Sequence, residues 1–264
     1  GEPLGHVRLL ETRSTDVNYD PREAGVENAT VSLALLADSA DAVLEQHRYE
    51  AHPDRPGIYV PADPQAIVRP LGTYRLRIEV PGADSLITST TTVPDTFSLA
   101  ASNPDTVTYG IDDPFGIRVS ESRYPGREAI YFLNTTVEDP LTEERLTPAG
   151  KELVDGTESL AGGSSYTLGS LSGNEWPMRS AEHYPRHEDG TLTIQYPWKN
   201  FVYYGPTTVH VHTVDENLHR FWQGDKAQAG GAPGVIPNVR DDLQGGAGLF
   251  TGLARQTYEV YVAR

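Results

Sequence analysis

The sequence predicts a mostly β protein with two immunoglobulin-like or fibronectin-like β-sandwich domains, the second carrying short helical and long loop insertions. Short runs in which apolar and polar residues alternate are typical of half-buried antiparallel strands. The 25 glycines and 20 prolines in 264 residues place frequent turns between these runs. Short strands separated by such turns are typical of sandwiches, and the length is sufficient for two of them.

The clearest strand of the first domain runs from Thr73 to Val80. We expect its apolar residues inside the first sandwich and its charged residues outside: Tyr74, Leu76, Ile78 and Val80 against Arg75, Arg77 and Glu79. The same alternation predicts a strand from Thr30 to Leu35. Further strands are predicted at 129–133, which is apolar on both faces and suits a central strand, and at 192–196 and 258–262.

Turn signals and a polar stretch predict where the domains divide. Pro56-Gly57, Pro81-Gly82, Pro125-Gly126 and Asp189-Gly190 separate the strands. Val93-Pro-Asp95, followed by polar residues, favours a boundary that leaves residues 1–95 as the first domain and 96–264 as the second.

Two helices interrupt the second domain. One is predicted from Thr147-Pro148 to Val154, with Gly156 at its end. The other is predicted from Val214 to Gln223. Thr213 and Glu216 have the spacing of a capping box, and the apolar stripe of this helix should pack on the second sandwich. That stripe consists of Leu218, Phe221 and Trp222.

Composition narrows the classes of partner. The net charge is −16, with 37 acidic against 21 basic side chains, so the surface repels nucleic acid and bare anionic membrane. The acidity fits solubility, with high-salt adaptation or calcium sites as alternatives. Cysteine is absent, which excludes disulfides and thiolate zinc sites. We interpret the start at Gly1 as the result of removing a signal peptide.

The pair His210 and His212 is a weak candidate for metal binding. On a strand, residues two apart point to one face, and two imidazoles on one face suit a metal ion. A third ligand would have to come from Asp215 or His219. The alternative is a plain polar sheet face opposite Val209 and Val211, and we expect no tightly bound transition metal.

A second weak metal candidate is a calcium loop. Its ligands would be Asp16, Asn18, Asp20 and Glu27, at loop positions that match. Pro21 stands where such a loop needs glycine, so a solvated acidic loop is the alternative. The acidic pairs 112–113 and 241–242 are interpreted as turn residues.

The long regions 157–189 and 224–250 are predicted to be irregular and to form a partner-facing or ligand-facing surface. Pro185 between His183 and His187 excludes a helical zinc pair. No nucleophile elbow or nucleotide loop occurs, and we predict no catalytic residue and no cofactor beyond the calcium candidate. The residues proposed for this surface are Trp176, Tyr184, Gly245, Gly246 and Gly248.

Several segments, in order, resemble a Bacteroidota family of surface lipoproteins whose domain has no assigned function. The resemblance rests on 31–35, Pro56-Gly-Ile-Tyr-Val60, 72–78, 90–94, Tyr203-Tyr-Gly205, 209–221 and 238–250. Members are often encoded beside TonB-dependent receptors. The resemblance implies a lipid-anchored protein at the outer membrane or cell surface, but no catalytic residues to carry over.

We therefore expect a non-enzymatic accessory or ligand-binding partner of a TonB-dependent receptor or another outer-membrane protein. One alternative is a secreted carbohydrate-active or metal-dependent enzyme built around the histidine pair. A third is a calcium-stabilised adhesion module.

Overall fold

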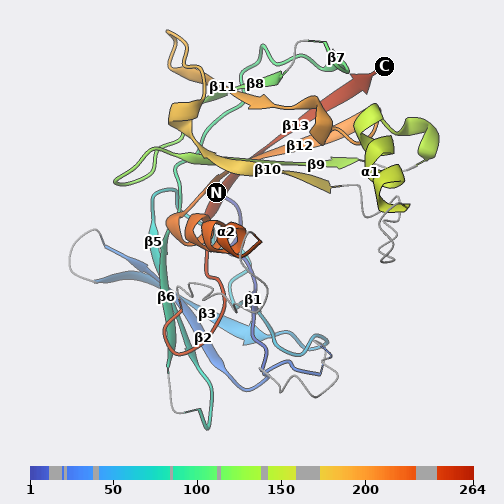
Figure 1. Ribbon diagram of the computed structural model, residues 1–264. Coiled ribbons are helices and arrows are strands. Elements are labelled where there is room, and N and C mark those ends of the chain that lie inside the picture. Colours follow the sequence, from blue (N-terminus) through green and yellow to red (C-terminus); the bar gives the residue numbers. More distant parts are fainter. Residues whose placement is uncertain are drawn as a thin grey trace. The chain divides into compact units, whose positions relative to one another are not determined.

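Antiparallel β-structure dominates the protein, as the sequence predicts (Figure 1). The computed structural model describes residues 1–11, 20, 23–37, 42–83, 86–111, 114–137, 142–158, 173–229 and 243–264, without the side chains of 155–158, 173–177 and 225–229. None of the helices in these ranges is long and apolar enough to cross a membrane.

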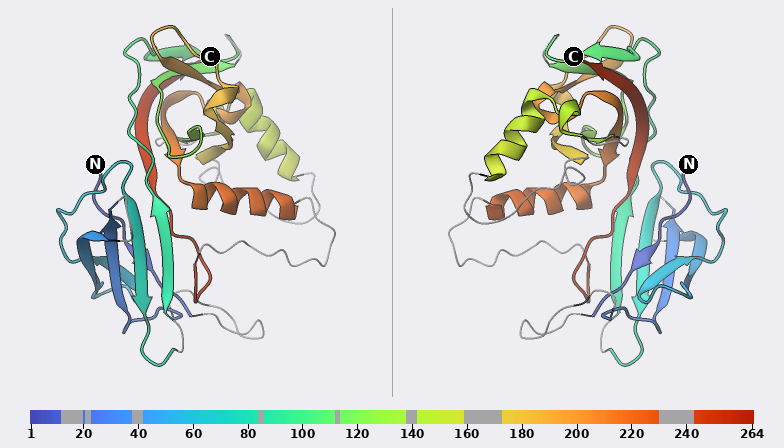
Figure 2. Two further views of the ribbon diagram at one scale, coloured as in Figure 1. Left: turned by 90° about the vertical axis from the view of Figure 1, so that its left-hand side faces the viewer. Right: turned by 90° about the vertical axis from the view of Figure 1, so that its right-hand side faces the viewer.

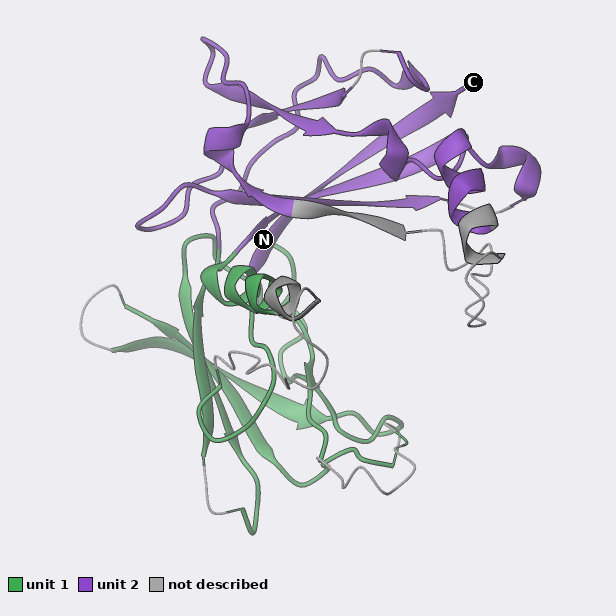
Figure 3. Ribbon diagram, in the orientation of Figure 1, with its two compact units in different colours: residues 1–93, 215–252 green, residues 94–214, 253–264 purple. Residues whose placement is uncertain are grey.

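The chain forms two compact units, and it passes between them three times (Figure 3). Unit 1 contains Gly1–Val93 and Asp215–Gly252, whereas unit 2 contains Pro94–Val214 and Leu253–Arg264. The prediction that 215–252 belongs to the second domain is therefore wrong. The physical reason is a set of hydrogen bonds that hold this segment on unit 1, described below.

Unit 1 is built on one six-stranded sheet. Its strands are β1 (Val7–Arg8), β4 (Ile58–Pro61), β3 (Val43–Ala51), β2 (Thr30–Leu36), β5 (Thr73–Glu79) and β6 (Ile87–Thr92), in that order across the sheet. All neighbouring pairs are antiparallel. Antiparallel pairing with one buried face explains why period-2 alternation located β2 and β5 in the sequence.

One face of this sheet carries the core of unit 1. Tyr74, Leu76 and Ile78 are buried and Arg77 and Glu79 are exposed, which confirms the predicted orientation of the strand. The two remaining predicted residues, Val80 and Arg75, are only partly buried. The core is completed by Val31, Leu33 and Leu35 from β2 and by Leu4, Tyr59, Ala66 and Val93.

The predicted turn at Pro56-Gly57 brings backbones into close contact. Gly57 has a φ of +75°, and a Cβ there would lie 2.4 Å from the carbonyl oxygen of Leu9. Only glycine meets both conditions. Beside it, the hydroxyl of Tyr59 donates to the carbonyl of Val26 (2.8 Å) and accepts from the amide of Ala29 (2.9 Å).

Unit 2 contains two sheets that share one core. The five-stranded sheet has the order β10 (Gly173–Ser180), β9 (Ile130–Val137), β12 (Gly205–Val214), β13 (Leu253–Ala263) and β7 (Thr106–Thr108), and the second sheet pairs β11 (Thr191–Tyr196) with β8 (Phe115–Ser120). Leu133, Val209 and Val260 of the first sheet join Ile117 and Leu192 of the second in one buried cluster. The predicted central strand at 129–133 is confirmed, because β9 pairs on both sides.

Figure 2 shows both helices, and each extends beyond the end predicted from the sequence. Helix α1 spans Pro148–Glu158 and continues through Gly156, and helix α2 spans Glu216–Ala229 and continues past the predicted end at Gln223. Helix α2 begins after Asp215 and belongs to unit 1, so the predicted capping box at Thr213 and the assignment of this helix to the second domain are wrong. The apolar stripe Leu218, Phe221 and Trp222 is only partly buried.

Parts of the two regions predicted to be irregular are regular. Strand β10 and the short helix η3 (Ala181–His183) lie within 157–189, and the end of α2 lies within 224–250. Two further short helices, η1 (Glu143–Arg145) and η4 (Trp198–Asn200), occur in unit 2.

Candidate functional site

Strand β12 places His210 and His212 on the face of the five-stranded sheet opposite the buried Val209 and Val211. Their rings are 6.3 Å apart between centroids. Strand β9 fixes both rings. His210 Nε2 shares a hydrogen bond with the hydroxyl of Thr136 (2.9 Å), and His212 Nε2 lies 2.9 Å from Asn134 Oδ1.

The two imidazoles are held in the neutral form. Burial, then the neighbouring His210 and Arg255, lowers the pKa of His212 to about 4. Burial, followed by Arg255, also lowers the pKa of His210. Because Asn134 Oδ1 can only accept, His212 carries its proton on Nε2. The Nδ1 atoms of both histidines have no hydrogen-bond partner in the described part of the chain.

The proposed third metal ligands are not brought to this pair within unit 2. Asp215 and His219 belong to unit 1, because the chain leaves unit 2 after Val214. His219 Nε2 bonds instead to Gln223 Nε2 one helical turn further on (2.9 Å). Across the described residues, no three His, Cys, Asp or Glu side chains form a group able to hold a metal ion.

Asp215 is the polar centre of unit 1, and its role was missed in the sequence. Its side chain is fully buried. Oδ1 accepts from the amide of Leu218 (2.8 Å) and the hydroxyl of Thr251 (2.7 Å), whereas Oδ2 accepts from the amide of Gly252 (3.0 Å) and the hydroxyl of Thr91. Asp215 is therefore the N-cap of α2 and joins that helix to β6 and to 251–252.

Asn217 strengthens the same junction. Its side-chain amide donates to the carbonyls of Thr90 and Phe250, both at 2.9 Å. An Asp directly before a helix is a readable N-cap signal. Nothing local in the sequence, however, indicates that the helix docks on β6, about 125 residues earlier in the chain.

The glycine-rich turn lies against β6. Gln244 exchanges backbone hydrogen bonds with Thr88 at 2.8 and 3.0 Å. Gly245 has a φ of +81°, and a Cβ there would lie 2.3 Å from the carbonyl oxygen of Leu86. A Cβ on Gly246 would lie 3.2 Å from the Ile87 side chain. These two glycines therefore allow close backbone packing on an edge strand, a role different from the predicted ligand surface.

Gly248 also adopts a positive φ, of +149°, in the same turn. Leu249 after it is exposed and Phe250 packs on the core of unit 1. The turn is thus anchored at both ends, by Gln244 and by Phe250.

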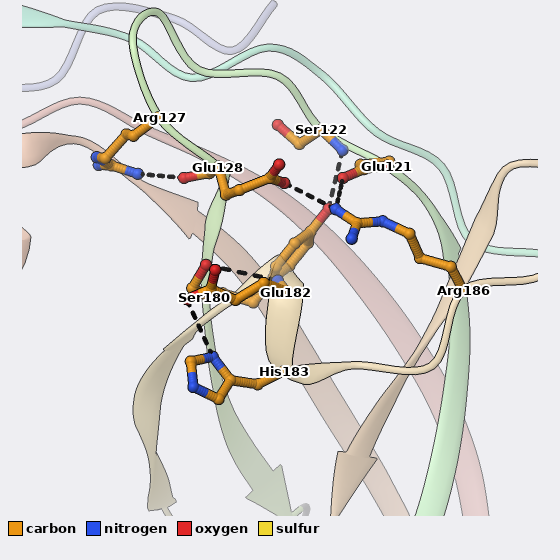
Figure 4. A network of polar contacts seen from close by, with 9 residues as sticks. Glu121, Ser122, Arg127, Glu128, Ser180, Glu182, His183 and Arg186 are labelled. Carbon is orange, nitrogen blue, oxygen red and sulfur yellow. Dashed lines mark hydrogen bonds and ion pairs between the residues drawn. The ribbon is translucent and has the colours of Figure 1, made fainter.

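The loop around Tyr184 packs on its own unit instead of facing a partner. Tyr184 is buried and meets the ring of Tyr131 edge-on at 6.2 Å. Next to it, Arg186 bonds to Glu121 (2.7 Å) and Glu128 (2.8 Å), as Figure 4 shows. The prediction that Tyr184 faces a ligand is therefore wrong, because its aromatic ring is buried in the core of unit 2.

The two histidines of this loop, His183 and His187, contact different residues. His183 Nδ1 lies 3.8 Å from Glu182, and His187 Nε2 bonds to the hydroxyl of Thr193 (2.8 Å). The backbone of Trp176 is part of β10, and its side chain lies outside the described residues.

Only part of the calcium candidate lies in the described chain. Asp16 and Asn18 fall outside it, as do the acidic pairs 112–113 and 241–242. The carbonyl of Asp20 accepts from the amides of Glu23 and Ala24 in a turn (3.1 and 3.2 Å), and Glu27 is exposed.

The outward side of β13 offers a continuous row of accessible side chains in unit 2. Every second residue is exposed, namely Leu253, Arg255, Thr257, Glu259 and Tyr261. We call these five residues the β13 row. The inward residues Tyr258, Val260 and Val262 are buried, so the strand that carries the row packs on the core of unit 2.

A model of one protein family matches nearly the whole chain, residues 5–259. No curated protein matches the sequence. Among solved structures, "Crystal structure of tetra-tandem repeat in extending region of large adhesion protein" matches 88% of this chain and 42% of that one, at 11% identity and a TM-score of 0.20. The chain thus spans less than half of that structure, and so low a TM-score supports no shared fold. The family match is extensive, and the chain belongs to the family described as "Domain of unknown function (DUF4249)".

Proposed function

We propose that this protein is a non-enzymatic binding protein of the outer membrane or cell surface. It acts as an accessory or ligand-binding partner of a TonB-dependent receptor. The resemblance of its ordered segments to the surface lipoprotein family supports this role, including the N-terminal lipid anchor. The observation that carries the binding function is the β13 row.

The β13 row combines exposed apolar, aromatic and charged side chains on one rigid strand. Leu253 and Tyr261 are 41% and 50% exposed, and Arg255 lies between them. Tyrosine and arginine are enriched where proteins bind one another and carry much of the binding energy. The backbone of β13 pairs with β12 along ten residues, so the β13 row is already ordered before a partner binds.

The charge of the protein indicates the kind of partner. A net charge of −16 steers association toward a basic patch and repels other acidic surfaces. Recovery of the partner should therefore decrease as ionic strength rises, whereas a purely apolar contact would be insensitive to salt or strengthened by it.

The proposal is tested by affinity capture from detergent-solubilised outer membranes. The bait is the full chain with Leu253→Thr and Tyr261→Thr, changes that suit a strand and remove the apolar surface. The matched control is Leu153→Thr in α1, because Leu153 is also 41% exposed.

We expect the double variant to lose a receptor-class partner that the unchanged chain and the control retain. Equal recovery by all three baits, with all three folded by circular dichroism, would refute the β13 row as the binding surface. The lipid anchor is tested separately, by labelling cells with a fatty acid and following the label to the outer-membrane fraction.

A further inference from the structure

Strand β6 is an edge strand whose composition suits pairing with a further strand. It lies at one end of the six-stranded sheet of unit 1, where β5 is its neighbour in the ladder. Its sequence Ile-Thr-Ser-Thr-Thr-Thr contains no charge and is β-branched at every position but one. Such residues favour strands, and an edge without charged side chains attracts other strands unless the fold covers it.

Two parts of the chain that are distant in sequence from β6 cover its edge. Gln244 exchanges two backbone hydrogen bonds with Thr88, at 2.8 and 3.0 Å. The side-chain amide of Asn217 donates to the carbonyl of Thr90 (2.9 Å). Figure 1 shows the chain before β13 running beside β6. We call residues 215–217 and 243–252 the β6 cover.

The β6 cover belongs to an insertion that lies outside the ladders of both sheets. The insertion leaves unit 2 after Val214 and returns at Leu253, and these two residues pair directly in the β12–β13 ladder. The six strands of the unit 1 sheet do not include it. A segment attached in this way can open as a separate unit while both sheets stay folded.

Polar contacts from Asp215, Asn217 and Gln244 hold much of the β6 cover in place. Of its large apolar side chains, Phe250 packs on the core of unit 1, whereas Leu249 is 37% exposed. When such a segment opens, its hydrogen bonds are exchanged for bonds to water, so each one stabilises the closed form only modestly. The cover is therefore easier to displace than β5, which pairs with β6 along six residues.

We propose that the edge of β6 is a strand-pairing surface for a second copy of this chain, and that the β6 cover keeps it closed. The two β6 strands pair antiparallel about a two-fold axis at Thr90, the commonest symmetry of homodimers. Cross-strand threonine pairs are favourable, and no like charges meet along this edge. Because copies of net charge −16 repel each other, an uncharged edge is a suitable place for them to meet.

The backbone of β6 determines this register. The N–H and C=O groups of Thr88 and the C=O group of Thr90 point toward the β6 cover and away from β5. Alternate residues of a strand direct their backbone groups to the same edge, so those of Thr92 point there as well. An axis at Thr90, the middle of the three, pairs all three threonines of each copy. A shifted axis leaves at least one of them unpaired.

The experiment measures self-association of the full chain by sedimentation velocity over a series of concentrations. The opening variant carries Asn217→Ala and Gln244→Pro, which remove two donors to β6 without changing β6 itself. The matched control is Gln223→Ala, whose side chain bonds to His219 within α2. Hydrogen exchange of the β6 amides reports opening of the cover, and exchange of the β2 and β5 amides reports whether the sheet stays folded.

We expect the opening variant to dimerise with a dissociation constant lower by about tenfold or more than that of the unchanged chain and of the control. Position 90 then tests the register. Adding Thr90→Lys or Thr90→Glu to the opening variant places two like charges at the axis, so each protein alone should lose the gain in dimerisation. An equimolar mixture of the two places opposite charges there and should regain it.

Three results would overturn the inference. They are a monomeric opening variant whose β6 amides exchange faster, an opening variant whose β6 exchange is unchanged, and dimerisation that persists with Thr90→Lys alone. If the β2 and β5 amides lose protection as well, Gly245→Ala replaces the opening variant, because a Cβ there would lie 2.3 Å from the carbonyl oxygen of Leu86, and Gly82→Ala is its control. None of these results bears on the receptor partner, because the β13 row is tested with different substitutions.

Discussion

Replacing Asp215 with alanine should release helix α2 from unit 1. The substitution removes the N-cap of α2, which costs about 1 kcal/mol. It also leaves the amide of Gly252 buried without an acceptor, at about 1–3 kcal/mol, and takes an acceptor from the hydroxyls of Thr91 and Thr251. The hydroxyls can rotate to other acceptors but the Gly252 amide cannot, so the total is roughly 2–4 kcal/mol.

Asp215→Asn should cost less, because its amide oxygen can still accept from Leu218 and Thr251. The new NH₂ group would face the Gly252 amide, donor against donor, so we expect about half the loss of the alanine variant. Asp63→Asn is the control, since Asp63 is exposed and asparagine keeps its bond to the amide of Gln65.

The assay combines urea unfolding with hydrogen exchange resolved by segment. We expect faster exchange in α2 and in 251–252 of Asp215→Ala, with the amides of β2 and β5 less affected. An unchanged unfolding midpoint and unchanged exchange in α2 would refute the conclusion that the buried carboxylate holds this segment on unit 1.

Three further predictions concern pH, backbone and core. The pKa of His212 is about 4 in the folded protein and 6.5 in the unfolded chain, so on acidification the unfolded chain binds the extra proton first. The stability due to the neutral imidazole is therefore complete above about pH 6.5. It declines as the pH falls toward 4, by on the order of 3 kcal/mol. His212→Gln should flatten this slope in urea titrations at several pH values, and a slope equal to that of the unchanged chain would contradict the role of His212. Gly245→Ala should lower stability by about 1–3 kcal/mol, because the position has a positive φ and a Cβ would clash with the Leu86 carbonyl. The control is Gly82→Ala, where φ is also positive but a Cβ would meet no neighbouring atom, and equal losses of stability in both variants would show that close packing on β6 is unimportant. Tyr184→Ala should cost about 3–5 kcal/mol as a buried aromatic, so a thermal midpoint like that of the exposed Tyr261→Ala would contradict its place in the core.

Strand positions were predictable from the sequence because alternation reports burial of one sheet face directly. Thr73 to Val80 and 129–133 show this, and so does the placement of His210 and His212 on the face opposite Val209 and Val211. These are properties of single strands, and period-2 patterns encode them locally.

The assignment of 215–252 to unit 1 was not predictable in the same way. It depends on Asp215 and Asn217 meeting Thr90, Thr91 and Gly252, partners distant in sequence. The structural role of Gly245 and Gly246 was not predictable for a similar reason, because the need for a small residue at these positions comes from contact with β6 and not from the turn itself. Tyr184 was misassigned since an irregular loop can still bury its aromatic residue in a core.

Site-specific photocrosslinking in cells tests the proposed binding surface most directly. A photoreactive phenylalanine derivative replaces Tyr261 in the β13 row, and a second protein carries it at Leu153 as a control of similar exposure. We expect a covalent adduct with an outer-membrane receptor from position 261 and none from position 153. Adducts from position 153 alone, with none from position 261 in a protein that reaches the membrane, would contradict it.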